Sequence, residues 1–109
     1  MDTKQAVEAL ASLAQEHRLK IFRLAVEAGQ SGLSAGAIAD RLGVPPSSLS
    51  FHLAHLKRAE LLTQERQSRT LIYRANYPMM NRLIAFMLQN CCAGDATAVD
   101  LLNSKGACP

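Results

Sequence analysis

The residues best suited to chemistry in this chain are three cysteines, which lie in its last quarter. Cys91 and Cys92 are adjacent, and Cys108 follows sixteen positions after the pair. Thiolates are soft ligands, and a site with three sulfur donors and no histidine favours a three-coordinate trivalent ion over zinc, which usually takes four ligands. We therefore expect these three cysteines to bind arsenite, As(III), or the similar ion antimonite, Sb(III).

Other interpretations of the thiols stay open. If Cys108 is not a ligand, the remaining pair suits a trivalent arsenical that already carries one carbon substituent, or another soft metal. The thiols are alternatively a redox sensor, or Cys91 is a small apolar side chain on the buried face of a helix. Adjacent helical residues point about 100° apart, so Cys91 and Cys92 reach one ion only where the helix ends, and Gly94 is expected to end it.

An enzymatic role is not expected for the chain. A nucleophilic Cys91 needs a base, and neither a histidine nor a catalytic motif lies near the pair in the sequence. His52 and His55 are three positions apart, but no carboxylate or thiol accompanies them in a ligand pattern. We therefore do not expect these histidines to bind a metal.

The distribution of charge indicates a nucleic-acid partner. The chain has 109 residues and a formal net charge of +3, and residues 41–74 hold six basic residues against two acidic ones. Positive charge that is concentrated on one segment is typical of a surface that contacts phosphates. The length and the 49% hydrophobic content predict one small domain, whose core is completed by a partner surface.

Residues 33–74 have the pattern of a helix-turn-helix followed by a two-stranded hairpin, and this pattern predicts binding to double-stranded DNA. The first helix is expected to start after the capping residue Ser34, and Pro46 opens a second helix that runs to about residue 59. Two steeply crossing helices need a small contact residue, a permissive turn residue and an apolar anchor. Those three are Ala39, Gly43 and Leu49.

The exposed face of the second helix is expected to contact bases and phosphates in the major groove. Its members are short or planar side chains: Ser47, Ser48, Ser50, Phe51, His52 and His55. Phe51 suits contact with a thymine methyl group. The hairpin turn is expected at residues 66–69, where Arg66 and Arg69 can contact phosphates or the minor groove. Because no glycine occupies this turn, a loose loop is expected instead of a tight primed turn.

Helices are also expected on both sides of this segment. Asp2 caps a first helix, and a second helix ends by Gly29. A last helix opens at Asn76 and carries a broad apolar face, made of Met80, Leu83, Ile84, Met87, Leu88 and Cys91. Because little chain remains to cover that face, we expect a homodimer in which the first and last helices pack against their mates. Two DNA-reading subunits predict an inverted-repeat operator with half-sites one helical turn apart, about 10 base pairs, or a multiple of it.

The sequence shows no membrane segment. It holds no run of about 18 apolar residues, and its N-terminus lacks the layout of a signal peptide. We therefore expect a cytoplasmic protein that does not associate with membranes. In that reducing compartment the cysteines are expected to be thiols and not disulfides.

Three stretches of the chain resemble the ArsR/SmtB family of metal-responsive repressors. They are residues 13–22 (LAQEHRLKIF), residues 42–56 (LGVPPSSLSFHLAHL) and residues 59–62 (AELL), within a match from about residue 6 to 92. The resemblance implies a mainly α, homodimeric winged helix-turn-helix with four helices, a small β-hairpin and a final helix. It also implies a repressor that needs no cofactor to bind DNA and releases its operon when an inducer binds. The residues it implies in DNA contact are Ser47, Ser48, Ser50, Phe51 and His52.

The chain departs from two inducer sites found in that family. The family's Cys-x-Cys pair at the start of the first DNA-reading helix is absent, because residues 34–38 contain no thiol. The family's zinc ligands on the last helix are absent as well, because residues 79–90 contain no His, Asp or Glu. Cys91, Cys92 and Cys108 are therefore the remaining candidates.

These patterns together predict a repressor of an arsenic resistance operon. Residues 1–92 form the DNA-binding and dimerisation domain, and residues 93–109 form a tail that contributes to the inducer site. Ion capture is expected to reorder the end of the dimerisation helix and to move the two DNA-reading helices out of register with successive major grooves. A constitutive DNA-binding regulator, or one that senses thiol redox state, is the main alternative.

Overall fold

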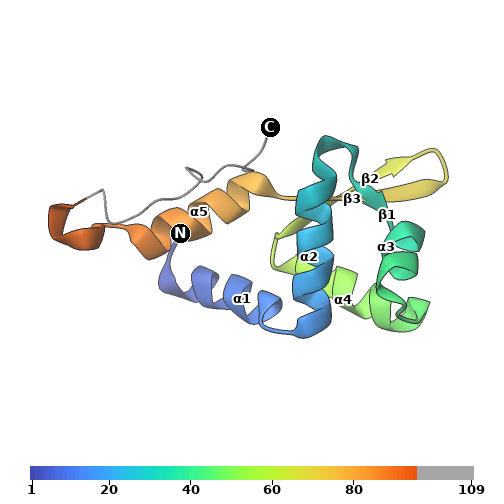
Figure 1. The fold of residues 1–109 in the computed structure, drawn as a ribbon, viewed down its shortest axis with the longest axis horizontal. Helices are drawn as coiled ribbons and strands as arrows, with labels where there is room; N and C mark the ends of the chain where they lie inside the picture. The colour runs from blue at the N-terminus through green and yellow to red at the C-terminus, as the bar shows by residue number, and fades with distance from the viewer. Residues whose placement is uncertain (96–109) are drawn as a thin grey trace.

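A computed structural model describes residues 1–95 of the chain and shows a winged helix-turn-helix (Figure 1). Its elements follow in chain order: α1 (Thr3–Leu13), α2 (Glu16–Ala28), η1 (Gly29–Ser31), β1 (Leu33–Ser34), α3 (Ala35–Leu42), α4 (Pro46–Arg58), β2 (Leu62–Gln67), β3 (Thr70–Ala75), α5 (Tyr77–Leu88) and η2 (Cys91–Gly94). The predicted mainly α, winged helix-turn-helix fold is confirmed. The short strand β1 is an addition that the sequence pattern did not indicate.

The helices begin at the capping residues that the sequence predicts. The Asp2 carboxylate accepts a hydrogen bond from the Gln5 amide at 2.8 Å, and the Gln5 side chain accepts one from the Asp2 amide at 2.9 Å. Ser34 Oγ accepts from the Ala37 amide at 3.1 Å, and Asn76 caps α5 in the same way. Each cap gives a partner to a first-turn amide that has none within its helix.

The turn between α3 and α4 has the geometry that the glycine allows. Gly43 adopts the left-handed conformation, with φ 67° and ψ 30°, and its amide donates to the Ala39 carbonyl at 2.8 Å. α4 then starts with Pro46 in its first turn, where a missing amide costs no hydrogen bond. The predicted bounds of both helices are therefore confirmed to within about one residue.

The wing is part of a three-stranded antiparallel sheet with the order β1-β3-β2. Gln67 pairs with Thr70, so only Ser68 and Arg69 form the loop between β2 and β3. The expectation of a loose loop is therefore wrong. Ser68 adopts a φ of 60°, a conformation that usually selects glycine, and the long ladder on either side of the turn holds it there.

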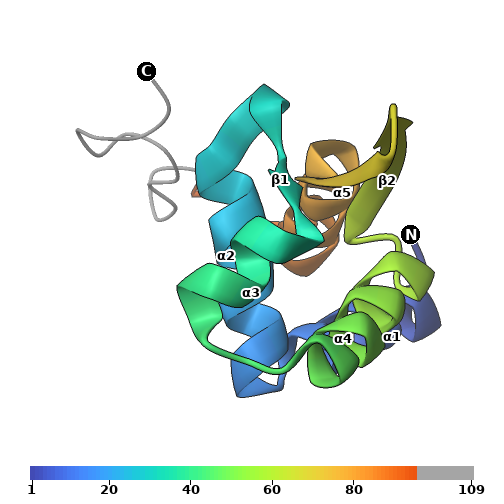
Figure 2. The same ribbon diagram turned by 90° about the vertical axis from the view of Figure 1, so that its right-hand side faces the viewer.

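All five α-helices and the base of the wing contribute to the core. Its fully buried members include Ile21, Ile38, Leu56, Leu61 and Leu83. In Figure 1, α1 and α5 lie side by side at one end of the molecule, while α3, α4 and the wing lie toward the other end. Figure 2 looks at that second end and shows α3, α4 and the wing together on it. Within residues 1–95, no helix has both the length and the apolar character needed to cross a bilayer.

Candidate nucleic-acid interface and thiol site

Four of the six residues predicted on the reading face of α4 are exposed. They are Ser47, Ser48, Ser50 and Phe51, and the Phe51 side chain is 60% exposed. On the opposite side of the helix, Leu49, Leu53 and Leu56 are buried in the core. α4 is therefore anchored by its apolar stripe and presents small hydroxyl side chains and one aromatic ring outward. A face of this shape and chemistry fits a DNA major groove, which admits one α-helix.

His52 does not lie on that exposed face, and its predicted placement there is wrong. It is only 9% exposed, and its ring centroid lies 5.5 Å from that of His17 at the start of α2. Residue 52 is three positions after Leu49 and four before Leu56, so the helical spacing puts it on the buried stripe. The sequence contained this signal, but the polarity of histidine obscured it.

His55 occupies an intermediate position at the edge of the same face. It is half-buried, and its Nδ1 lies 3.0 Å from the Ser12 hydroxyl of α1. The bond ties α4 to α1 and turns one ring nitrogen away from solvent. His55 therefore has a role in helix packing within the chain, whatever else it contacts.

Burial also sets the charge of the neighbouring His52. Desolvation lowers its pKa below the usual range, and the positive charges of Arg18, His17 and His55 lower that pKa further. The buried Nδ1 of His52 has no hydrogen-bond partner among residues 1–95. The neutral imidazole is thus the form that this environment favours.

Arg66 and Arg69 are both exposed near the tip of the wing, as predicted. The base of the wing is held by Arg74, whose guanidinium donates to the Glu65 carboxylate and to the Gln30 carbonyl, each at 2.7 Å. From the sequence, Arg74 is only one of the six basic residues in the segment 41–74, because its partners depend on the strand register and on the loop after α2. Two arginines remain at the tip without an ion pair within the described chain.

The adjacent cysteines lie beyond α5 and not on its apolar face, so the predicted helical position of Cys91 is wrong. α5 ends at Leu88, and Asn90 takes a left-handed conformation with φ 58°. The chain then forms the single turn η2, in which Cys92 also has a positive φ of 68°. The helix therefore stops before the cysteines, about six positions earlier than Gly94 would have ended it.

This break brings the two sulfur atoms onto one side of the chain. The Cys92 thiol donates to Cys91 Sγ at 2.7 Å, and both residues are half-buried. The hydrogen bond to Cys91 raises the pKa of the Cys92 thiol, and burial and charge on Cys91 act in the same direction. Residues 1–95 contain no cluster of three His, Cys, Asp or Glu side chains that could hold a metal ion. The third predicted ligand, Cys108, lies outside the described residues, as does most of the predicted tail.

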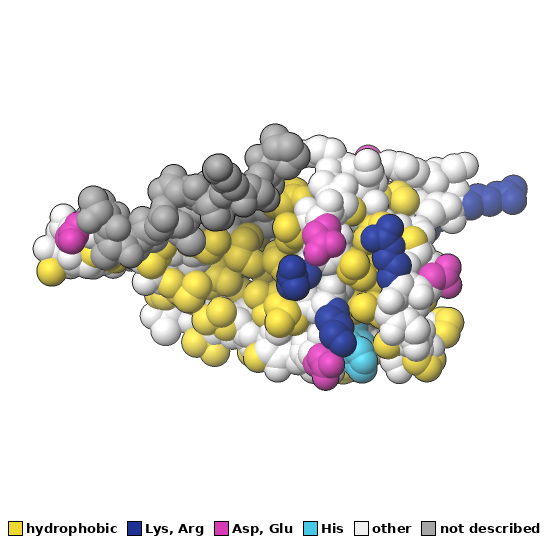
Figure 3. All heavy atoms as spheres, viewed as in Figure 1, with side chains coloured by type: hydrophobic (Ala, Val, Ile, Leu, Met, Phe, Trp, Pro, Cys, Tyr) yellow, Lys and Arg dark blue, Asp and Glu magenta, His cyan; other side chains and the backbone are white. Residues whose placement is uncertain are grey.

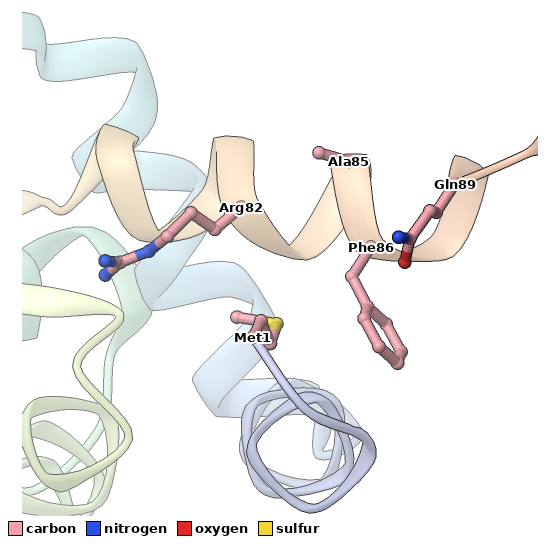
Figure 4. Close-up of a pocket in the computed structure, with 5 residues that line it drawn as sticks. All are labelled: Met1, Arg82, Ala85, Phe86 and Gln89. Carbon is pink, nitrogen blue, oxygen red and sulfur yellow. The ribbon is translucent and has the colours of Figure 1, made fainter.

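In the described part of the chain, α1 and α5 expose apolar side chains at the opposite end from the wing. Val7 and Leu10 on α1 are 56% and 41% exposed, and Met87 on α5 is 54% exposed. Hydrophobic side chains gather over these two helices in Figure 3. A groove of about 370 Å³ runs along the same end, lined by Met1, Arg82, Ala85, Phe86 and Gln89, with the Phe86 ring projecting from α5 beside the start of α1 (Figure 4).

Comparison with known proteins agrees with this geometry. A family profile described as a helix-turn-helix domain matches residues 13–65. The transcriptional activator HlyU of Vibrio cholerae serotype O1 is 33% identical over 72 residues, which make up 66% of this chain. The chain spans 64% of the length of that relative.

Solved structures share the fold. An ArsR-like transcriptional regulator from Rhodococcus sp. RHA1 superposes with a TM-score of 0.71 at 25% identity, covering 77% of this chain and 76% of that one. Reduced HlyU from Vibrio cholerae N16961 gives 0.64 at 27% identity, covering 83% and 93%. A homodimeric winged helix-turn-helix DNA-binding domain from Mycobacterium bovis gives 0.65 at 22% identity, covering 77% and 76%, and shares the fold alone.

These findings define the class of this protein: the chain carries a helix-turn-helix domain in a winged-helix fold. Within that class, the neighbours named above include ArsR-like and HlyU transcriptional regulators, and none of them is described as an enzyme.

Proposed function

We propose that this chain is a homodimeric, DNA-binding transcriptional regulator of the ArsR type, whose affinity for DNA is controlled by trivalent arsenic at its C-terminal thiols. The observation that carries the DNA-binding part is the exposed face of α4, anchored by buried leucines and placed at the same end as the arginine-tipped wing. The match of residues 13–65 to a helix-turn-helix profile and the similarity to a transcriptional activator over 72 residues support it.

In this proposal α4 enters the major groove. Phe51 contacts a thymine methyl group, while Ser47, Ser48 and Ser50 donate hydrogen bonds to base edges or phosphates. Arg66 and Arg69 on the wing contact phosphates or the adjacent minor groove, and they make the affinity fall with rising salt. His52 is not among the contacts, because the ring is buried behind the helix.

A second copy of the chain covers the exposed apolar residues of α1 and α5. Val7, Leu10 and Met87 are large hydrophobic side chains in solvent, and their burial against a two-fold mate removes apolar surface from water. The dimer then presents two copies of α4 to an inverted-repeat operator.

Arsenite binding requires the two sulfurs to approach one atom from the same side. Cys91 Sγ and Cys92 Sγ are in contact with each other, which favours such capture. In the reaction As(OH)₃ + 2 RSH → (RS)₂As(OH) + 2 H₂O, two As–S bonds replace two As–O bonds, the thiol protons leave in water, and arsenic stays trivalent. Cys108 completes a three-sulfur site by displacing the last hydroxide in the same way. Antimonite reacts alike, and an arsenical with one carbon substituent stops at two sulfurs.

The regulatory direction that we propose is release of DNA on ion binding. Capture of the ion reorders the chain after α5, changes the packing of the dimer and moves the recognition helices out of register. Linkage then requires that DNA lower the affinity for arsenite by the same factor, typically worth about 1–3 kcal/mol. The relative from Vibrio cholerae is named an activator. For this chain we propose the opposite sign, in which bound protein represses its genes and release of DNA switches them on. A reducing cytoplasm, as the sequence predicts, keeps the thiols free.

The test is a titration of DNA binding by fluorescence anisotropy at fixed salt with arsenite, antimonite, a monosubstituted arsenical, zinc and no ion. Wild-type protein should release DNA with arsenite, and the double variant Cys91→Ser/Cys92→Ser should bind DNA normally and ignore arsenite. Cys108→Ser separates a three-sulfur site, which it weakens, from a two-sulfur site, which it leaves intact. DNA binding that is unchanged in saturating arsenite refutes the inducer and leaves a constitutive regulator.

Thiol oxidation is the second candidate signal, and the same short distance between the sulfurs favours it. Two thiols in contact can lose two electrons and two protons to an oxidant such as a peroxide, which is reduced to water, and so form a disulfide. Two measurements of DNA binding distinguish the signals, one with peroxide and one with arsenite in excess monothiol reductant. Because the reductant reverses the disulfide, release of DNA that persists in its presence is due to arsenite.

A further inference from the structure

All three histidines of the chain lie where α4 packs against α1 and α2. His52 of α4 is buried, and its ring lies 5.5 Å from the ring of His17, at a tilt of 44°. His55, one turn later on α4, has its Nδ1 3.0 Å from the Ser12 hydroxyl of α1. The neighbouring Arg18 donates from Nε to the Ser12 carbonyl at 2.7 Å. This histidine cluster (His17, His52 and His55 with Arg18 and Ser12) is where α1, α2 and α4 are held together.

The surroundings of His52 in this cluster favour its neutral form over its protonated form. The ionisable groups that act on His52 are His17 and Arg18 from α2 and His55 from α4, and each is a cation when charged. α1 contributes the uncharged Ser12. No ion pair within residues 1–95 includes His52. If its buried Nδ1 carried a proton, that N–H would have no acceptor among these residues. A charged His52 would therefore be a buried cation beside Arg18, without a partner, which is a costly arrangement.

The cluster also supports the exposed aromatic ring of the reading face. Phe51 packs edge to face against His52, with centroids 5.6 Å apart, and against His55 at 6.3 Å. Aromatic contacts of this geometry orient the rings that make them. The direction in which Phe51 points into the groove thus depends on where the two imidazoles lie.

We propose that His52 is a positioning residue for DNA recognition: its neutral ring, packed between His17 and Phe51, holds α4 and Phe51 in the binding conformation, and its protonation releases them. DNA binding is therefore lost in acid. The inference rests on the proposed DNA-binding function and adds a regulatory input that is separate from the thiols.

The sign of the effect identifies its source. Added positive charge on a protein surface normally strengthens the attraction to phosphates, so protonation of exposed histidines raises DNA affinity. Protonation of His52 acts in the opposite direction, because the charged ring leaves its buried site and removes the support of Phe51. Below the pKa of His52, one linked proton lowers the affinity by up to about tenfold per pH unit for each subunit.

The experiment measures DNA affinity by anisotropy from pH 7.5 to pH 5 at constant ionic strength, with the full chain. NMR titration of the imidazole C–H signals gives the pKa of each histidine in the same buffers. Wild-type affinity should fall in acid, with a midpoint at the pKa of His52. His52→Gln, which has no ring to support Phe51 and cannot be charged, should bind DNA more weakly than wild type at pH 7.5, and that weaker affinity should not fall further in acid. His17→Gln should keep the loss but move its midpoint to higher pH, because it removes a positive neighbour.

Each outcome decides the matter. Acid loss whose midpoint follows the His52 titration, in wild type and in His17→Gln, supports the inference even if His52→Gln does not fold. Affinity that stays constant or rises while the NMR signal shows His52 becoming charged overturns it. If the wild-type protein does not bind DNA even at pH 7.5, the proposed function itself is refuted. That result differs from DNA binding that merely lacks the pH dependence.

Discussion

Gly32 allows the sharpest test of the packing between the wing and the helix-turn-helix. Its φ is 67° and its ψ is −171°, a region that is essentially restricted to glycine. A Cβ at this position would lie 2.6 Å from Ile72 Cγ2, 2.8 Å from the Tyr73 carbonyl oxygen and 2.9 Å from Arg74 Cγ. Because one of these atoms belongs to the backbone of β3, the neighbours cannot all move aside without disturbing the pairing of β1 with β3.

We expect Gly32→Ala to lower the free energy of unfolding by about 2–6 kcal/mol. Backbone strain contributes about 1–3 kcal/mol, and overpacking against β3 contributes about 1–3 kcal/mol. Gly43→Ala is the comparison variant, since Gly43 has the same φ of 67°, a left-handed ψ of 30° and no atom within 4 Å of the added Cβ. Its expected loss is the left-handed strain alone, about 1–2 kcal/mol.

Urea unfolding followed by circular dichroism measures both variants under one set of conditions. The difference between them contains the steric clash with β3 and the additional backbone strain at Gly32, whose ψ of −171° is less accessible to alanine than the ψ of 30° at Gly43. If Gly32→Ala and Gly43→Ala lose the same free energy to within about 0.5 kcal/mol, the close approach of β1 to β3 does not exist as described and the reasoning fails.

Four further outcomes are expected. Gly36→Ala should stabilise the chain by up to about 1 kcal/mol in urea unfolding, because its Cβ meets nothing closer than Ser34 Oγ at 3.9 Å and alanine favours a helix; a loss would contradict this. Ser34→Ala should cost about 1 kcal/mol through the lost cap, and Ser34→Asp should retain most of it. Because burial lowers the pKa of folded His52, stability should be complete above about pH 6.5 and should decline as the pH falls through the lower folded pKa, a slope that is reduced in His52→Gln. Leu10→Glu should give monomers in sedimentation velocity, whereas Ser47→Glu, which leaves the α1–α5 end intact, should give dimers with weakened DNA binding.

The sequence predicted the parts of the fold that local rules determine. Asp2, Ser34 and Asn76 mark helix starts, and Gly43 marks the turn, because each acts on amides or torsion angles within a few residues of itself. β1 was missed because its two residues have no periodicity, and only the pairing with β3 defines it. The tight turn at Ser68 was missed for a related reason, since long-range strand pairing overrides the preference for glycine there.

The candidate site was predictable to the same extent. Helical spacing predicts the exposure of the serines and of Phe51. The same spacing also predicts the burial of His52, but the polarity of histidine suggested the opposite. The relation of Cys91 to Cys92 was not predictable, because it depends on the left-handed turn at Asn90. The anchoring of Arg74 was not predictable either, since its two partners come from different parts of the chain.

The early end of α5 limits which parts of the protein can respond to a change at the thiols. The buried residues of that helix, Met79 and Leu83, belong to its first two turns, and the cysteines follow only after its last turn and a two-residue joint. Among the described residues, none from 84 to 90, which precede the cysteines, is fully buried. In the proposed dimer the second copy packs against this end of α5, so we expect arsenic capture to change DNA affinity in the dimer and not in an isolated subunit.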